Sequence, residues 1–475
     1  MAEVFQHGIN AIGHGLIGYV VPFLFVLTIV VFFHELGHFL VARWAGVRVL
    51  TFSLGFGPEL LGFTDRKGTR WKVSAVPLGG YVKFFGDENE ASAPSAASLS
   101  EMSAEERAVS FHHQKVLPRA AIVAAGPIAN FLLAIVIFAG LALAFGKQVI
   151  VPRIGEVVPG TSAAAAGFQP GDVIVSVDGS PIESFGDVAQ TIAINAGHPL
   201  VFAIDRSGTP VTVTATPTQR SERDRFGNVQ RIGTLDISGP IMPARVVAIQ
   251  PNSAAAAAGF ESGDRVRAIN GKPVTSFVEL RDIVAASPDK ALEFDVDRDG
   301  RMIELHATPT GHDEKDKNGA SKRVGQLGIQ GGYEPSDTRA VHYGLIGAVE
   351  SGAKETWFVV DRTLAFIGGV FVGREDADQL GGPIRIAQIS GQVATMGLDA
   401  LIHLAAVLSV SIGMLNLFPV PLLDGGHLLF YAFEAAMGRP LSERAQEVGY
   451  RIGLALVLML MIFATYNDIL HLAAS

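Results

Sequence analysis

Two histidines and a glutamate in His34-Glu35-Leu36-Gly37-His38 have the spacing of a metal-binding helix. Residues four apart lie on one face of a helix, so the two imidazoles can bind one metal ion. Glu35 is then placed to take a proton from a metal-bound water, which zinc makes acidic enough to attack a peptide carbonyl near neutral pH. The motif predicts metal-assisted hydrolysis, with His34 and His38 as ligands and Glu35 as the base.

The surroundings of this motif strengthen the prediction. It directly follows the apolar run of residues 23–33. Ionisable side chains in such a run are costly and by default suggest function. The alternative is that two histidines and a glutamate merely pack near a membrane edge. Three ionisable groups would then need partners without any catalytic gain, which makes this alternative the weaker one.

A hydrolytic zinc site keeps three protein ligands and one open position, so one more ligand has to come from elsewhere. Because the chain has no cysteine, that ligand is His, Asp or Glu. Asp424 is the best candidate, since it lies in an apolar segment, residues 416–426, that prolines and glycines interrupt. Two alternatives stay open. Asp424 could cap a helix beginning at Gly425, which is compatible with metal binding, and His427 could be the ligand instead.

Four apolar stretches are long enough to position these residues in a bilayer, which requires about 20 residues each. They cover residues 16–42, 120–145, 401–437 with a break at its prolines, and 452–470. Broken backbone at membrane depth is tolerated only where it lines a protected cavity. We therefore expect a polytopic α-helical membrane protein with four transmembrane helices and the site at the break.

The composition supports a membrane protein and excludes other classes. Charged residues make up 17% of the chain, below the roughly 25% of soluble domains, and the mean hydropathy is +0.34. A net charge of -9 argues against nucleic-acid binding. The lack of cysteine excludes disulfides, thiolate metal sites and a cysteine nucleophile.

Basic residues near the span ends predict the orientation. Arg43, Arg48, Lys115 and Arg119 flank the first loop, and Arg439, Arg444 and Arg451 flank the connection before the last span. Both loops are therefore expected in the cytoplasm. The long middle region, residues 146–400, is expected on the outer side.

The middle region contains an internal duplication. Each of four residues recurs 92 positions later, namely Gly167, Gly171, Asp172 and Gly179 as Gly259, Gly263, Asp264 and Gly271. A constant offset over several residue types indicates two copies of one module. In each copy an alternating strand leads into Asp-Gly or Asn-Gly, which is a strong tight-turn signal. We expect two tandem, mainly β domains.

The loop between the first two spans also has strand patterns. Residues 71–76 and 80–85 read as two strands joined through Pro77-Leu78-Gly79-Gly80, which predicts a β-hairpin. An exposed strand edge there could pair with an unwound substrate and hold it extended; the alternative is an ordinary surface hairpin. The predicted organisation is two spans with this loop (1–145), two β domains (146–236 and 237–325), an outer membrane-surface segment (326–400) and two spans (401–475).

In this order the motifs resemble the site-2 protease family of intramembrane zinc metalloproteases. The resemblance rests on the paired histidines in the first span, Ala125-Gly-Pro-Ile-Ala-Asn130 in the second, and Asn-x-x-Pro-x-Pro-Leu-Leu-Asp-Gly in the third. The two repeats, with Ala-Gly-Phe, Gly-Asp, a strand and Asp/Asn-Gly in order, resemble PDZ domains. The likeness covers nearly the whole chain.

The resemblance implies a role for each site residue. His34, His38 and Asp424 are expected to bind Zn²⁺, Glu35 to act as catalytic base, and Asn416 to help hold the substrate. The expected partners are the lipid bilayer of a bacterial inner membrane and single-span membrane proteins trimmed on the outer side, such as an anti-sigma factor or a signal-peptide remnant. The hairpin is expected to dip into the membrane, and the PDZ-like pair to act as a periplasmic size filter.

Two other functions are consistent with parts of the pattern. A catalytically silent scaffold could use only the PDZ-like modules, but the intact Glu35 argues against it. A zinc transporter would need polar residues along a path through several spans and often has repeated membrane halves. Here the ionisable residues cluster at one depth, and the duplication lies outside the predicted spans.

Overall fold

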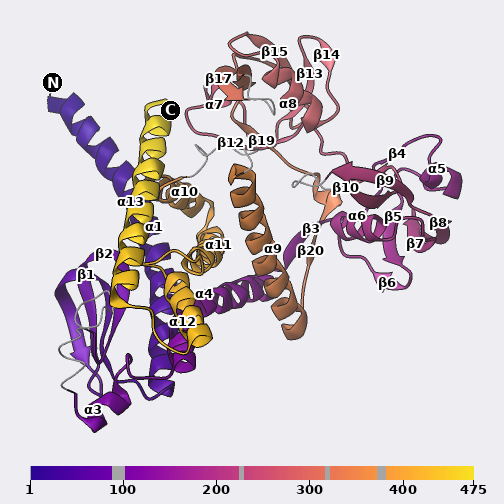
Figure 1. Ribbon diagram of the computed structural model, residues 1–475. Coiled ribbons are helices and arrows are strands. Elements are labelled where there is room, and N and C mark those ends of the chain that lie inside the picture. The colour runs from indigo at the N-terminus through magenta and orange to yellow at the C-terminus, as the bar shows by residue number, and fades with distance from the viewer. Residues whose placement is uncertain (1, 88–101, 224–228, 316–320, 372–380, 475) are drawn as a thin grey trace. The chain divides into compact units, whose positions relative to one another are not determined.

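The computed structural model describes residues 2–87, 102–223, 229–315, 321–371 and 381–474. The chain divides into two compact units. One is helical and combines Met1–Phe145 with Tyr343–Ser475, so segments from both ends of the chain build it together (Figure 1). The other is the β-rich unit Gly146–His342.

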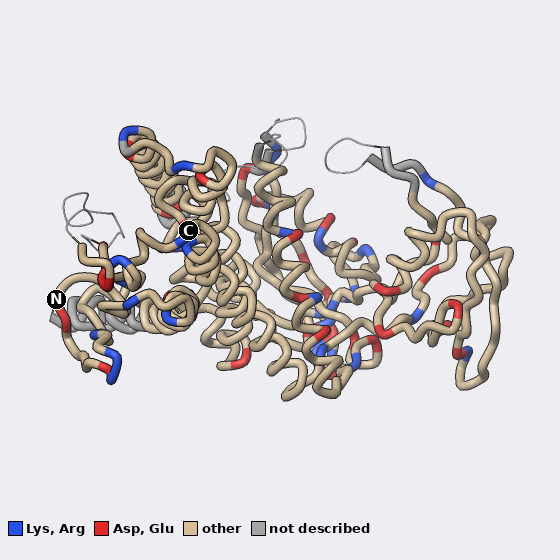
Figure 2. The backbone as a smooth tube through the Cα atoms, turned by 60° about the horizontal axis from the view of Figure 1, so that its bottom comes forward, with Lys and Arg blue, Asp and Glu red and all other residues tan. Residues whose placement is uncertain are grey.

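The helical unit contains the predicted spans. Its elements are α1 (Ala2–Trp44), β1 (Val49–Thr64), β2 (Arg70–Phe84), α3 (Ala104–Val109), α4 (Val116–Phe145), α9 (Leu345–Phe371), α10 (Pro383–Met396), α11 (Leu398–Asn416), α12 (Asp424–Met437) and α13 (Glu443–Ala474). In the described residues, four stretches are long and apolar enough to cross a membrane: Gly18–Trp44, Val116–Phe145, Leu398–Asn416 and Arg444–Leu470. Figure 2 shows long helical stretches in this unit without charged residues. The prediction of four apolar stretches is confirmed, but the third apolar helix ends at Asn416, and the residues after the proline break form the separate helix α12.

Small residues bring α1, α4 and α11 close together. A Cβ on Gly37 of α1 would meet the carbonyl carbon of Ala125 at 2.8 Å, and one on Gly413 of α11 would lie 3.0 Å from the Cβ of Asn130. The buried Ser409 hydroxyl of α11 donates to the Asn130 carbonyl at 2.9 Å. Close backbone approach of this kind is how membrane helices gain packing contacts where lipid is as apolar as their side chains.

The predicted hairpin is present, but its strands differ from the prediction. β1 and β2 are antiparallel and are joined by residues 65–69, so the two predicted strands both belong to β2. Phe52 of β1 pairs with Val82 on one side and with Trp71 on the other. Residues 51–54 therefore separate the segments that were expected to pair directly. The prediction was wrong because the true partner lies upstream, where the Phe52 ring stacks on Trp71 with centroids 4.3 Å apart.

The turn of this hairpin is tied to the end of α1. Asp65 accepts hydrogen bonds from Arg43 Nη2 at 2.5 Å, from Trp71 Nε1 at 3.2 Å and from the Lys67 and Thr69 amides at 2.8 and 3.1 Å. Burial alone would raise the pKa of Asp65, but the hydrogen bonds from Trp71, Thr69, Arg43 and Lys67 together lower that pKa to about 2. The ionised carboxylate therefore holds the hairpin against the helix that carries the two histidines.

The β-rich unit contains two similar repeats. The first comprises β4 (Glu156–Val157), α5 (Ser162–Ala166), β5 (Val173–Val177), β6 (Ser180–Pro181), α6 (Phe185–Ile194), β7 (Leu200–Arg206), β8 (Thr209–Ala215), β9 (Thr218–Arg223), β10 (Val229–Thr234) and β11 (Ile237–Ser238). The second comprises β12 (Val246–Ile249), α7 (Ala254–Ala257), β13 (Arg265–Ile269), β14 (Lys272–Pro273), α8 (Phe277–Ala285), β15 (Leu292–Arg298), β16 (Arg301–Ala307), β17 (Thr310–Lys315), β18 (Ser321–Gln326) and β19 (Ile329–Gly331). β3 (Lys147–Ile150) pairs with β20 (Thr338–Val341), next to a short 3-10 helix, Pro335–Asp337.

The repeats share topology and packing. Each has a four-stranded antiparallel sheet, ordered β6-β5-β7-β8 and β14-β13-β15-β16. Each contains a buried aspartate paired with an arginine, Asp172 with Arg206 at 2.8 Å and Asp264 with Arg298 at 2.7 Å. β11 pairs with β4, and β19 pairs with β12. These pairings extend each repeat a few residues past the boundaries drawn from the sequence.

Candidate metal centre

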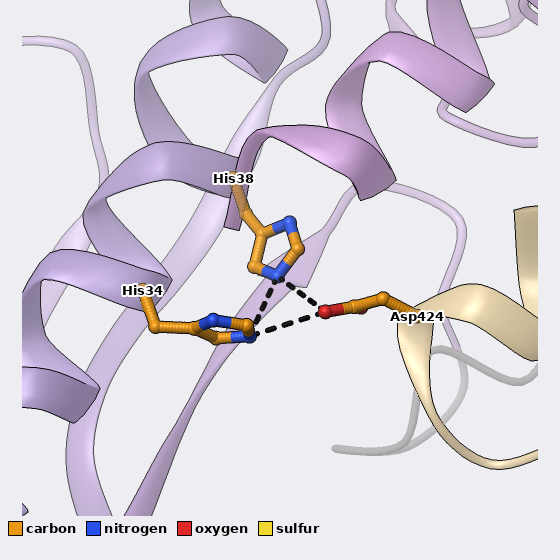
Figure 3. A group of neighbouring side chains, drawn as sticks. All are labelled: His34, His38 and Asp424. Carbon is orange, nitrogen blue, oxygen red and sulfur yellow. Dashed lines mark hydrogen bonds and ion pairs between the residues drawn. The ribbon is translucent and has the colours of Figure 1, made fainter. Parts of the chain in front are cut away.

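Three side chains from two distant parts of the chain meet at one point. His34 and His38 stand one turn apart on α1, and Asp424 is the first residue of α12 (Figure 3). His34 Nε2 lies 3.2 Å from His38 Nε2 and 3.2 Å from Asp424 Oδ2. His38 Nε2 lies 3.6 Å from the same carboxylate oxygen. The structure therefore brings together the three residues that the sequence singled out as possible ligands.

The spacing of these atoms fits a tetrahedral metal ion. Ligand atoms about 2.0–2.1 Å from a tetrahedral zinc stand about 3.3 Å from one another. The three observed separations, 3.2, 3.2 and 3.6 Å, bracket that value. Asp424 Oδ2 is buried without a hydrogen-bond partner among the described residues, and a cation would satisfy it. Two imidazoles and one carboxylate are also a ligand set that zinc favours.

The tautomer of His38 is set by a backbone carbonyl. His38 Nδ1 lies 2.8 Å from the Ile122 carbonyl oxygen of α4. A carbonyl only accepts, so Nδ1 of the neutral ring carries the proton. Nε2 then turns its lone pair toward His34 and Asp424, as a metal ligand requires. This is the arrangement by which outer partners orient metal-binding histidines.

His34 has a comparable partner in Asn130. Asn130 Nδ2 lies 3.3 Å from His34 Nδ1, and Asn130 Oδ1 is buried without a hydrogen-bond partner among the described residues. Turning the amide by 180° exchanges its oxygen and nitrogen, so that Oδ1 accepts from Nδ1–H. His34 Nε2 is then free of a proton and points at the same centre. The sequence motif containing Asn130 was noted, but no role was predicted for this residue.

Glycines let neighbouring elements approach the site. A Cβ on Gly126 of α4 would lie 2.5 Å from His38 Cε1 and 2.9 Å from His34 Cε1. A Cβ on Gly80 of β2 would lie 3.1 Å from Glu35 Cγ. The α4 backbone thus packs directly on the two imidazole rings, and β2 passes beside the glutamate. Any larger residue at Gly126 would displace the rings.

Glu35 and Asn416 complete the surroundings of the three side chains. Both line a cavity of about 750 Å³ together with His34, His38 and Asp424. Glu35 is 9% exposed. Asn416 Nδ2, at the end of α11, is 3.5 Å from His34 Nε2. A carboxylate and an amide therefore face the same space as the possible metal site, where a bound peptide could reach both.

The loop between α11 and α12 is tightly folded. Leu422 has a φ of 102°, a conformation that costs a non-glycine residue roughly 1–3 kcal/mol. A Cβ on Gly425 would overlap the carbonyl oxygens of Leu417 and Phe418. The helix cap expected as an alternative role of Asp424 is not formed, because Leu423 is the N-cap of α12 and no side-chain cap is found among the described residues. The loop instead presents Asp424 to the histidines.

His427, the rival ligand, is not part of this cluster. Within the described residues, the groups whose metal-binding atoms lie within 4.8 Å of one another are His34 with His38 and Asp424, and an exposed set, Glu293 with Glu304 and His306. His427 contacts Tyr450 instead, with its Nδ1 3.4 Å from the tyrosine hydroxyl. The local geometry favours Asp424 over His427 as the third ligand.

Comparison with known proteins gives matches along most of the chain. The family model described as peptidase family M50 matches residues 22–460. A protein of Agrobacterium fabrum named as a zinc metalloprotease is 43% identical over 454 residues, which cover 96% of this chain and 96% of that protein. The regulator of sigma-E protease of Salmonella typhimurium is 35% identical over 451 residues, covering 94% of this chain and 97% of that protein.

Among solved structures, the PDZ domain of an SdrC-like protein from Listeria innocua is similar to a smaller part. It has 17% sequence identity and a TM-score of 0.16, and the match covers 21% of this chain and 99% of that domain. The corresponding domain from Listeria monocytogenes gives 17% identity, a TM-score of 0.15, and 20% and 92% coverage. Scores this low do not establish a shared fold.

Proposed function

The chain belongs to peptidase family M50, and from that premise we propose that it hydrolyses peptide bonds within or near the transmembrane segments of other membrane proteins. It is a zinc metalloprotease and an integral membrane protein. The observation that carries the proposal is the meeting of His34, His38 and Asp424 at tetrahedral spacing beside Glu35, on elements that belong to or adjoin apolar spans.

Each residue of the site has a proposed task. His34, His38 and Asp424 hold the zinc, which when bound supplies a Lewis acid that lowers the pKa of water to about 7. Glu35 takes a proton from the attacking water and delivers it to the amine that leaves when the C–N bond breaks. Asn416 holds the substrate backbone near the cleaved bond, which its place in the cavity supports.

The hairpin is proposed to present the substrate in extended form. In β2, Gly80 lies against Glu35, and residues 80–83 pair with residues 51–54 on one side. A substrate strand added to the other edge of this segment would run past Glu35 with its peptide groups hydrogen-bonded to β2. A transmembrane helix has to unwind before its backbone can be cut, and such pairing would stabilise the unwound state.

The orientation and the substrate class are also proposals. Basic residues around the first loop support a cytoplasmic hairpin and a periplasmic β-rich unit in a bacterial inner membrane. The two repeats, as PDZ-like domains, would exclude substrates with large outer domains, while α9 and α10 would guide trimmed ones. Single-span proteins of the anti-sigma factor type and signal-peptide remnants are the proposed substrates. The name of one relative, a regulator of sigma-E protease, supports a link to the control of a sigma factor.

Cleavage by purified protein tests the proposal. Wild-type protein, Glu35→Gln and His34→Ala are reconstituted in lipid nanodiscs with a single-span model substrate, and the products are identified by mass spectrometry. We expect the wild type to cut within or next to the span and both variants to lose at least about a hundredfold in rate. Unchanged cleavage by Glu35→Gln would refute the mechanism. Activity limited to soluble peptides would refute the substrate class.

A silent scaffold is the competing function, in which the repeats alone would act. It predicts no hydrolysis in the wild type and equal binding of substrate by wild type and Glu35→Gln. The buried Glu35 beside a complete set of ligands favours the protease, since an unused buried carboxylate would be a cost to folding.

A further inference from the structure

His427 and Tyr450 line the catalytic cavity but have no role in the mechanism above. Both face the space that contains His34 and Glu35. His427 follows Asp424 by three residues on α12, and residues three apart share one face of a helix with Cβ atoms about 5–6 Å apart. His427 is therefore on the same face of α12 as Asp424 and about one turn along it, although it is outside the cluster of Asp424 with the two histidines.

Tyr450 is held next to His427 by close packing of α13. A Cβ on Gly449 would lie 2.9 Å from Phe430 Cζ of α12, and one on Gly453 would overlap the Pro421 carbonyl. These two glycines, four residues apart, let α13 rest on α12 and on the loop before Asp424. Tyr450 lies between them, with its ring centroid 5.7 Å from that of His427 and its hydroxyl 3.4 Å from Nδ1.

This contact is compatible with both neutral tautomers of His427, because a phenol hydroxyl can donate to Nδ1 or accept from it. Among the described residues, the Tyr450 hydroxyl has Nδ1 of His427 as its hydrogen-bond partner. When the phenol donates to Nδ1, this nitrogen is the acceptor and the proton of the neutral ring resides on Nε2. The assignment is opposite to that of His38, whose Nδ1 carries the proton because a carbonyl accepts it. In that tautomer His427 has an N–H donor at Nε2, whereas His38 has a lone pair there.

We infer that the Tyr450 hydroxyl donates to Nδ1 of His427, which makes Tyr450 a positioning residue, and that His427 is a catalytic residue whose Nε2–H stabilises the negative charge on the substrate. The inference rests on the proposed protease function. When the water oxygen bonds to the carbonyl carbon, the C=O π electrons move to the oxygen, and His427 Nε2–H donates a hydrogen bond to it. No proton leaves His427. The C–N bond then breaks, the carbonyl re-forms, and the amine takes the proton that Glu35 removed from water. A preorganised donor of this kind acts most strongly where charge develops.

Three variants separate this role from metal binding and from packing. His427→Phe keeps a ring without a donor, His427→Gln keeps an N–H donor, and Tyr450→Phe removes the hydroxyl that sets the tautomer. His403→Gln on α11, whose ring packs against Phe138, is the matched histidine control, and Tyr466→Phe is the control for α13. For each protein the zinc content, kcat and KM are measured with the single-span substrate.

The expected result is a loss in kcat with zinc and KM retained. His427→Phe loses on the order of 10²–10³-fold in kcat, His427→Gln loses less, and Tyr450→Phe loses on the order of tenfold. The double variant Tyr450→Phe with His427→Phe is no slower than His427→Phe alone. A peptide phosphinate, which carries a tetrahedral anion, binds more weakly to His427→Phe by a similar factor, whereas both controls stay within about twofold of wild type.

Two outcomes would overturn the inference. Loss of zinc from His427→Phe would make His427 a metal ligand, and a kcat within about twofold of wild type would make it part of the cavity wall. Failure of the proposed function is distinguishable, because it would appear as absent cleavage by the wild type or as full cleavage by Glu35→Gln.

Discussion

Replacing Gly126 with alanine would introduce one methyl group against both metal-binding rings. The new Cβ would lie 2.5 Å from His38 Cε1 and 2.9 Å from His34 Cε1, whereas unstrained carbon contacts are about 3.5–4.0 Å. The His38 ring therefore has to move by about 1 Å, or α4 has to retreat from α1 by a similar distance. Either movement takes His38 Nε2 away from the point at which it and Asp424 Oδ2 would both contact the metal.

The size of the expected loss follows from how small a displacement a zinc–nitrogen bond and the catalysed reaction tolerate. Zinc–nitrogen distances vary by only about 0.2 Å around 2.0–2.1 Å. A shift of about 1 Å breaks such a bond, and misplacement of that size costs about a hundredfold in rate. Helix stability does not oppose the change, because alanine is favoured over glycine inside a soluble helix by about 1 kcal/mol. We expect Gly126→Ala to fold and to lose most of its zinc and at least 99% of its activity.

The assay compares zinc per chain, melting temperature and cleavage rate for wild type, Gly126→Ala and Gly140→Ala. Gly140 is the matched control, because it lies in the same helix and a Cβ there would have no heavy atom within 4 Å. Gly140→Ala is expected to match the wild type in all three measurements. Full zinc content and full activity in Gly126→Ala would show that α4 does not pack on the rings and would refute the reasoning.

Three further perturbations act on the surroundings of the site and on the repeats. Asn130→Ala should weaken zinc binding about 10–100-fold, because His34 loses the partner that orients it, and a chelator competition that gives wild-type affinity would contradict this. Asp65→Asn should lower the melting temperature at pH 7. The folded pKa of Asp65 is about 2, below the ordinary value of about 3.9. The difference in melting temperature between wild type and Asp65→Asn should therefore shrink as the pH falls below about 4. A melting-temperature difference independent of pH would exclude the carboxylate as its cause. Asp264→Asn should destabilise the second repeat by about 1–3 kcal/mol, because the ion pair with Arg298 is lost; unchanged amide hydrogen exchange in that repeat of the full chain would contradict this.

Local patterns made much of the site predictable from sequence. The i, i+4 spacing of His34 and His38 determines that they share a helix face, and the structure keeps both on α1. Asp424 was identifiable because it is an ionisable residue in an apolar, interrupted segment, where a charge requires a partner. The four spans followed from hydropathy alone, since about 20 apolar residues are needed to cross lipid.

Features that depend on contacts between distant residues were missed. The strand order of the hairpin arises because residues 51–54 insert between two segments of β2, which no alternation within residues 71–85 reveals. Gly126 and Asn130 were visible as a motif, but their task became apparent only once α4 was seen to pack on the imidazoles. Glycines that admit a neighbouring ring are hard to distinguish in sequence from those that serve a turn.

Zinc stoichiometry in purified protein tests the central claim most directly. Wild type, His34→Ala, His38→Ala and Asp424→Ala are prepared with the same zinc exposure and measured by inductively coupled plasma mass spectrometry, with Gly140→Ala as control. We expect one zinc per chain in wild type and in Gly140→Ala, and far less than one in each of the other three. A full zinc complement in Asp424→Ala would contradict the account, because the carboxylate that meets the two histidines would then not hold the metal.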